Sequence, residues 1–321
     1  MSKKLRIGGA SGFWGDSVIA TPQLLNGNDL DFIVYDYLAE ITMSIMARAR
    51  AKDATKGYAV DFVSSVLKLN LRQIADQKVK ILSNAGGVNP EACAEAIREL
   101  IKELKLDLKV SVVLGDDLMR EKNKFSELNT KEMYSNEDFP AEDKIASINA
   151  YLGAFPIAEA LKSGADIVIT GRSVDSAVTL GACIYAFGWN EKEYDKLAAG
   201  SLAGHIIECG TQSTGGNFTD WELVSKDLHQ IGYPIVEVSE DGSFDCTKSK
   251  NSTGMVSFGT VAEQMLYEIG DPQAYMLPDV ICDFSNVKIE ETGKDKVKIS
   301  GAKGYPAPNQ YKVCATYADG F

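Results

Sequence analysis

Residues 4–17 have the sequence KLRIGGASGFWGDS, which predicts a short strand that runs directly into a glycine-rich turn. Strands and helices then alternate along the chain. Further strands are predicted over residues 31–36, 108–117 and 165–172, with a strand and its loop over residues 78–87, and helices over residues 38–51, 90–104, 148–164 and 173–188. This alternation predicts an α/β fold with a mostly parallel, doubly wound sheet, an αβα sandwich.

The texture of the sequence changes after about residue 225. Residues 233–246, 286–304 and 311–318 alternate apolar and polar side chains around the turn sequences EDG and TGKD, so they predict antiparallel hairpins. One helix is expected among them, over residues 259–270. We therefore expect an α/β domain over residues 1–225, with a polar insertion or lid at about 120–144. A β-rich part over residues 226–321 follows, and we expect it to be incomplete at its C-terminus.

Composition excludes several classes of function. Lys and Arg number 33 against 45 Asp and Glu, a formal charge of −12, which argues against binding to nucleic acid or to an anionic membrane. The histidines are His205 and His229, too few for a three-histidine zinc site. The start lacks a signal-peptide pattern, and the six cysteines form no CxxC pair. These features predict a cytoplasmic protein with reduced thiols.

The first turn carries glycines three residues apart and an acid about 20 residues further on, at Asp36, which is the dinucleotide fingerprint in outline. Against NAD(P), Pro22 interrupts the helix that should follow, and Asp16 would face a pyrophosphate. No tyrosine is followed four residues later by the lysine that short-chain dehydrogenases need. A tight turn that packs strand on helix is an alternative. We favour a loop that binds another anionic small molecule, through Gly9, Ser11, Gly12 and Gly15.

The carboxyl ends of the other predicted strands supply a second group of candidates, because ligands of open α/β sheets lie at this edge. Arg172 suits a carboxylate or phosphate, with a structural ion pair as the alternative. Asp116 and Asp117 could act on a ligand, or lie at a helix N-cap or in a solvated loop. The acids at this edge could serve as a base or as metal ligands. The further candidates at this edge are Asn84, Gly86, Gly87, Ser173 and Asp175.

Residues 203–221, AGHIIECGTQSTGGNFTDW, are the densest polar and glycine-rich cluster. On a helix, His205, Glu208 and Cys209 share one face. They could hold a metal, pair as base and orienting group, or activate Cys209 as a nucleophile. Alternatively, the helix ends at Gly210 with Cys209 buried. The loop that follows suits a carboxylate or thioester oxygen, through Thr211, Gln212, Ser213, Thr214, Gly215 and Asn217.

Four ordered motifs, RIGGASGFWGDS, SNAGGVNP, ITGRSVDSA and the cluster at 203–221, resemble the acyclic terpene utilisation (AtuA) family over essentially the whole chain. The resemblance implies a cytoplasmic catabolic protein that handles a branched acid or its CoA ester. Members of the family usually run longer than this chain.

For the reaction we expect a lyase or hydratase. Arg172 and the glycine loops would hold the anion, Asp16, Asp175 or Glu208 would move the proton, and His205 would assist. The alternatives are a non-catalytic ligand-binding or scaffolding subunit and an NAD(P)-dependent oxidoreductase. The expected partners are a small-molecule substrate and a second copy or a catabolic partner subunit. The sequence identifies neither a cofactor nor a metal.

Overall fold

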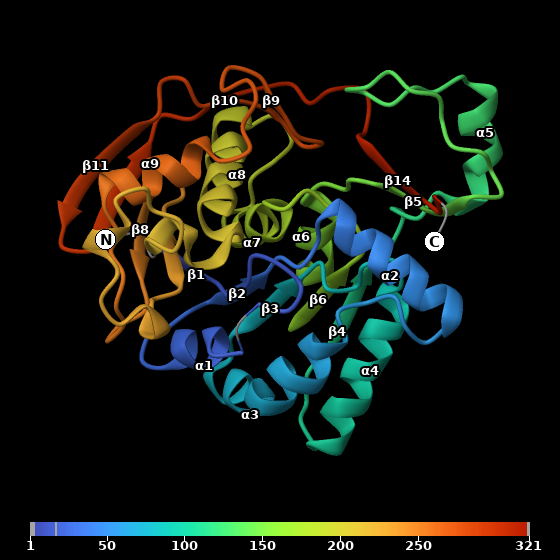
Figure 1. The fold of residues 1–321 in the computed structure, drawn as a ribbon. Helices are drawn as coiled ribbons and strands as arrows, with labels where there is room; N and C mark the ends of the chain where they lie inside the picture. The colour runs from blue at the N-terminus through green and yellow to red at the C-terminus, as the bar shows by residue number, and fades with distance from the viewer. Residues whose placement is uncertain (1–3, 17, 320–321) are drawn as a thin grey trace.

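The computed structural model describes residues 4–16 and 18–319, so Ser17 of the first turn lies outside the described residues. Its centre is a nine-stranded sheet in the order β11-β12-β8-β7-β1-β2-β3-β6-β4 (Figure 1). The last five strands of that order are parallel, with β1 at Leu5–Gly9, β2 at Phe32–Tyr35, β3 at Lys80–Ser83, β6 at Ile167–Thr170 and β4 at Val110–Val113. The predicted α/β class with a parallel sheet is confirmed.

Both faces of this sheet are covered by helices, as predicted. Side chains alternate between the faces along β2, so Phe32 and Val34 join one core while Ile33 and Tyr35 join the other. The first core includes α6 (Phe155–Lys162), α7 (Ala177–Phe187) and α8 (Tyr194–Glu208). The second includes α1 (Ala20–Leu25), α2 (Glu40–Lys52), η1 (Phe62–Leu67), α3 (Lys68–Gln77) and α4 (Pro90–Glu103).

The antiparallel strands of the C-terminal part extend the same sheet. β7 (Pro234–Val238) pairs with β1, and β8 (Phe244–Lys248), β12 (Lys296–Ser300) and β11 (Lys288–Gly293) follow outward. The hairpins predicted around EDG and TGKD are both present. β9 (Tyr275–Met276), β10 (Ile281–Asp283) and β13 (Lys303–Tyr305) form a smaller sheet, and α9 is Phe258–Leu266. The division into two domains at residue 225 stays a prediction.

One predicted helix is partly wrong. Residues 148–164 were expected to be helical throughout, but their start belongs to β5 (Ile145–Ala150), and α6 begins at Phe155. β5 pairs with β14 (Val313–Tyr317), which was expected in a local hairpin. Because the two partners are so distant in sequence, neither segment carries a local signal of this pairing. The resulting two-stranded sheet lies beside α2 (Figure 1).

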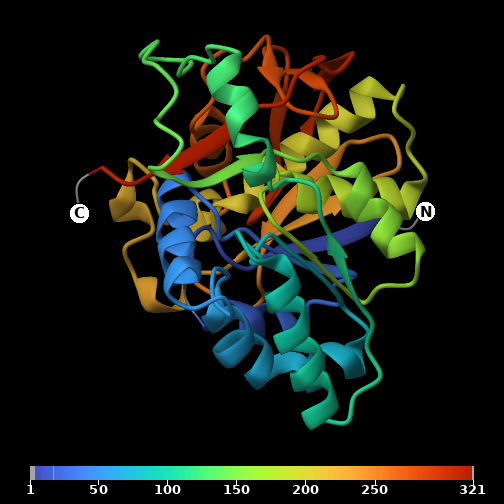
Figure 2. The ribbon, with the colours of Figure 1, turned by 90° about the vertical axis from the view of Figure 1, so that its right-hand side faces the viewer.

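The polar segment predicted at 120–144 contains η2 (Met119–Glu121) and α5 (Lys122–Glu127), followed by a largely exposed loop. It lies at the periphery of the molecule in both views (Figures 1 and 2). Within the described residues, no helix has the length and apolar character that a membrane-spanning segment requires.

The first glycine turn packs against the end of α8. A Cβ atom on Gly9 would lie 2.4 Å from the Ile207 carbonyl oxygen, and one on Gly12 would lie 2.8 Å from the backbone of Cys209. Both glycines therefore allow two backbone segments to approach closely. For Gly9 and Gly12, the structure therefore shows the alternative in which the turn packs a strand closely on a helix.

We expect Gly9→Ala to lower the free energy of unfolding by about 2 kcal/mol, because the α8 backbone must shift to admit one methyl group. Gly270→Ala is the matched control, because its Cβ would have no neighbour within 4 Å. Denaturant unfolding of both variants measures the difference. Equal stability of the two variants would contradict the close approach.

Candidate functional site

A buried arginine occupies the carboxyl edge of the parallel strands. Arg172 follows β6 and is 2% exposed. Its Nη1 donates to the Leu38 carbonyl oxygen at 3.0 Å and to Asp175 Oδ1 at 2.9 Å, and its guanidinium lies 4.2 Å from the centre of the Tyr151 ring. Burial disfavours the charged guanidinium, but Asp175 and Tyr151 outweigh this and raise the pKa of Arg172. The structural ion pair is therefore formed, and it engages Nη1 of the guanidinium.

Asp175 is the partner of this arginine and is reached by solvent. About a third of its side chain (33%) is exposed. Burial raises the pKa of Asp175, Arg172 lowers it, and the nearby Glu208 carboxylate raises it again, to about 6. A carboxyl group with this pKa exchanges a proton near neutral pH, which is the property of a general acid or base.

Asp36 and Asn84 form the neighbouring part of the same edge. The Asn84 amide donates to Asp36 Oδ1 at 2.5 Å, and Asn84 Oδ1 accepts from the Tyr37 backbone N–H at 2.8 Å. Burial, followed by Asp175 and Glu208, raises the pKa of Asp36 well above its ordinary value. Asp36 therefore holds its proton to a higher pH than an exposed aspartate does, and it is enclosed by protein. Ser11 belongs here as well, since its hydroxyl donates to the Asp36 carbonyl oxygen at 3.0 Å.

Glu40 and Tyr151 complete the group, and the sequence analysis missed both. The Tyr151 hydroxyl donates to Glu40 Oε1. Burial raises the pKa of Glu40, but Tyr151 and Arg172 more than offset this and lower it to about 2. Glu40 begins α2, and Tyr151 follows the unpredicted strand β5. Because Tyr151 directly follows β5, it would have become a candidate if that strand had been predicted.

His205 and Glu208 lie in the last turn of α8, on one face, as the spacing predicted. His205 Nδ1 lies 2.7 Å from Glu208 Oε1, and both side chains are buried. Burial lowers the pKa of His205, but the Glu208 carboxylate outweighs it, so the net shift is upward. The Gln264 amide holds this turn by donating to the His205 carbonyl oxygen at 2.9 Å. This contact is the one that a base and its orienting group require, and that role stays a prediction.

The other roles considered for this turn find less support. Burial and the Glu208 carboxylate raise the pKa of Cys209, which keeps its thiol protonated and a poor nucleophile. Among residues 4–16 and 18–319, no group of three His, Cys, Asp or Glu side chains has an arrangement suited to a metal ion. Gly210 ends the helix with φ +56°, as expected.

The remaining glycines also lie at close approaches. A Cβ on Gly86 would lie 2.4 Å from the Thr170 carbonyl oxygen, and one on Gly87 (φ +53°) 2.2 Å from Met46 Sδ. Gly15 is open, with φ +96°, while Asp16 accepts from the Gly12 N–H at 2.9 Å and from the Tyr233 hydroxyl. Gly9 and Gly12 face the protein and Asp36 is enclosed, so these three residues of the dinucleotide fingerprint are closed to a ligand, whereas Gly15 is open.

The loop after α8 is a short helical turn, η3 (Gly210–Thr214), followed by an exposed segment. The Thr214 hydroxyl donates to the carbonyl oxygens of Thr211 and Gly232, at 3.0 and 2.6 Å. Ser213 is buried and Asn217 is exposed. Two further short helical turns follow along the chain, η4 (Trp221–Leu223) and η5 (Leu228–Gln230). The residues proposed from the sequence therefore fall into two groups. One charged network contains Arg172, Asp175, His205, Glu208 and Asn84. Outside it lie Asp16, Gly15 and Asn217.

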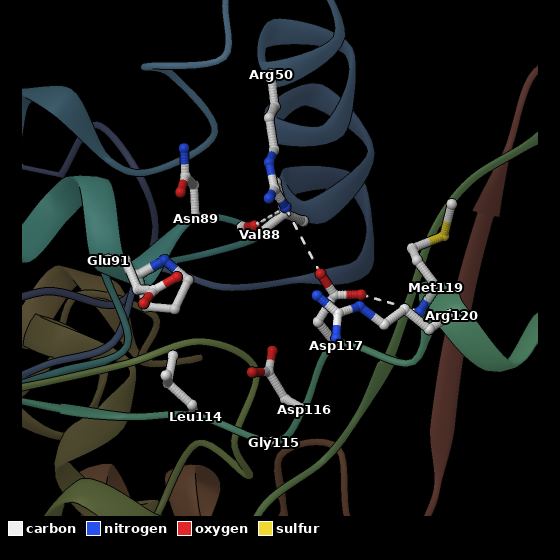
Figure 3. A pocket seen from close by; sticks show the side chains of 11 residues that line it. Arg50, Val88, Asn89, Glu91, Leu114, Gly115, Asp116, Asp117, Met119 and Arg120 are labelled. Carbon is white, nitrogen blue, oxygen red and sulfur yellow. Dashed lines mark hydrogen bonds and ion pairs between the residues drawn. The ribbon is translucent and has the colours of Figure 1, made fainter.

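A pocket opens beside this network, at the carboxyl end of β4. It has a volume of about 420 Å³, and its lining includes Asp116, Asp117, Arg50, Arg120 and Glu91 (Figure 3). Asp116 Oδ2 accepts from the Arg172 backbone N–H and from the Asn149 amide, both at 2.8 Å. Burial raises the pKa of Asp116. Arg172 thus joins the pocket to the network, with its backbone on Asp116 and its guanidinium on Asp175. Ser173, the next residue, is buried.

We expect the stability of the wild-type protein to fall between pH 5 and pH 8 by more than that of Asp36→Asn. The pKa of Asp36 is higher in the folded chain than in the unfolded chain, so the folded chain binds this proton more tightly. The proton therefore stabilises the fold at low pH, and this stabilisation is lost as the pH rises from the unfolded pKa toward the folded pKa. An asparagine carries no such proton. Asp53→Asn is the control, because hydrogen bonds from Thr55 lower the pKa of that exposed carboxylate. Denaturant unfolding at both pH values provides the measurement, and parallel losses in all three proteins would contradict the expectation.

Comparison with known proteins gives a single clear result. The family model described as acyclic terpene utilisation family protein AtuA matches residues 5–321. No match was found among curated proteins or solved structures. The matched range covers essentially the whole chain and includes the four motifs from which the resemblance was inferred. The chain belongs to the acyclic terpene utilisation family AtuA.

Proposed function

We propose that this protein is an enzyme of lyase or hydratase type that acts on a branched carboxylic acid or its CoA ester. Membership in the family supports a part in acyclic terpene utilisation, and such compounds carry branched carbon chains. The observation on which the proposal rests is Asp175, a partly exposed carboxyl group with a pKa of about 6 at the carboxyl edge of the sheet. Perturbed carboxyl groups at this edge are typical of acid–base sites.

In such a reaction a base removes a proton from the carbon next to a carbonyl group, and the hydroxyl group of the following carbon takes up a proton and leaves as water; addition of water is the reverse. Asp175 supplies the proton transfer in this proposal. Arg172 acts as its positioning residue, since the 2.9 Å ion pair fixes the carboxyl group. This differs from the role first expected for Arg172, which was to hold the substrate anion. The His205–Glu208 pair adds the second ionisable unit beside Asp175.

Two wider features belong to the same proposal. The six cysteines are free thiols, which supports a reducing, cytoplasmic location. The poor fit of the first turn to a dinucleotide supports a reaction without NAD(P).

We expect Asp175→Asn to lower kcat by roughly 10²- to 10⁴-fold, because the amide cannot accept or deliver the proton. In the direction in which Asp175 acts as base, kcat should also fall in the wild type below pH about 6, where the group is protonated. Asp138→Asn is the matched control, because that side chain is 88% exposed on the peripheral segment. Purified protein is assayed with branched acids and their CoA esters, in both directions.

Equal activity of Asp175→Asn and the wild type would overturn the assignment of Asp175. Turnover that requires NAD(P) would favour an oxidoreductase. A wild-type protein that binds these compounds without converting any of them would favour a ligand-binding or scaffolding subunit.

A further inference from the structure

The pocket at the end of β4 continues into a second cavity. That cavity, of about 300 Å³, shares Arg50, Val88, Asp117 and Met119 with the first, so the two form one groove. The groove runs from the start of α4, past the carboxyl end of β4, to β5, where Ser147 and Asn149 line it. None of the sequence motifs contains Arg50, Met119 or Arg120, and the proposed function makes no use of these residues.

The two arginines of the groove come from different elements. Arg50 lies at the end of α2, donates to the Val88 carbonyl oxygen, and lies 3.6 Å from Asp117 Oδ2. Arg120 lies in η2, and its guanidinium has no hydrogen-bond or ion-pair partner within the part of the chain that the structure describes. Figure 3 shows the Arg50 guanidinium facing Asp117, with Arg120 also at the wall of the pocket. Arg120 is therefore an exposed cation at the wall of the cavity, where a ligand competes with water and not with an acid of the protein.

The acids of the groove set the charge that a ligand can carry. Asp117 Oδ1 accepts from the Met119 N–H at 2.9 Å, and Asp116 is fixed by Arg172 and Asn149. Glu91, in the first turn of α4, lies on the opposite wall (Figure 3). These carboxyl groups disfavour a doubly charged phosphate. A single negative charge bound to Arg120 meets less repulsion, and the planar guanidinium matches a carboxylate.

The rest of the wall is apolar. Val88, Leu114 and Met119 line the groove near the arginines, and Ala47, Ala51 and Ala146 line its far part. Such a surface suits a hydrocarbon chain, because each buried methylene adds favourable transfer free energy.

We propose that this groove binds an aliphatic carboxylate, with the carboxylate group on Arg120 and the chain against Val88, Leu114 and Met119. Asp116 also lines the pocket but is only 2% exposed, because its carboxyl group packs against Gly171, so Arg120 and the apolar side chains make the main contacts with the ligand. The identity of this ligand as a substrate or product rests on the proposed function. The binding site itself rests on the groove.

Calorimetric titration of the full chain with octanoate, 1-octanol and octyl phosphate tests the proposal. Octanoate should bind more tightly than the other two, and Arg120→Ala should weaken its binding by roughly 10- to 100-fold, the range of a charge-assisted hydrogen bond. Lys124→Ala is the matched control. It removes one positive charge from the same peripheral segment, at a side chain that pairs with Glu121 and does not line the groove.

Tighter binding of octanol or octyl phosphate, absence of octanoate binding, or equal affinities of Arg120→Ala and Lys124→Ala would each overturn the proposal. The experiment separates this inference from the proposed function, because it measures no turnover. Octanoate binding that depends on Arg120 in a protein without lyase or hydratase activity would overturn the proposed function alone. Activity on branched acids in a protein that binds no octanoate would overturn the groove alone.

Discussion

The buried guanidinium of Arg172 is the interaction on which the rest of the site depends. Among the described residues its guanidinium is the cation paired with Asp175, and it offsets the repulsion that Asp175 meets from the nearby Glu208 carboxylate. The same residue joins three parts of the chain. Its guanidinium bonds Leu38 after β2, its backbone N–H bonds Asp116 after β4, and its side chain lies on Tyr151 after β5.

The position of Tyr151 gives the strand β14 a part in this site. Tyr151 lies between two cations, with Arg172 at 4.2 Å and Lys312 at 4.7 Å from its ring centre. Lys312 precedes β14, and its carbonyl oxygen accepts from the Tyr151 N–H at 3.0 Å. The C-terminal strand thus covers the aromatic ring that covers the arginine. Residues from both ends of the chain consequently contribute to one network, since Glu40 bonds the same tyrosine.

The sequence predicted the fold class and part of this network for a physical reason. Alternating buried strands and amphipathic helices leave only a parallel, doubly wound arrangement, and residues that follow such strands must meet at one edge. Arg172, Asp175 and Asn84 were placed there correctly on that basis. Glu40, Arg50 and Arg120 lie on helical elements whose sequence does not show which neighbour they will face. Tyr151 depends on the pairing of β5 with β14, which no local pattern encodes.

The glycines show a second limit of sequence reasoning, because an absent Cβ serves two purposes that the sequence cannot distinguish. A missing side chain can admit a ligand or admit another segment of the same chain. Gly9, Gly12 and Gly86 face Ile207, Cys209 and Thr170, so their space belongs to the protein. An anionic ligand must therefore be held by side chains at this edge. Arg172 already pairs with Asp175, so the proposed groove draws its positive charge from outside the network. In a protein of net charge −12, the arginines that line the pocket with Asp116 are the residues on which that proposal depends.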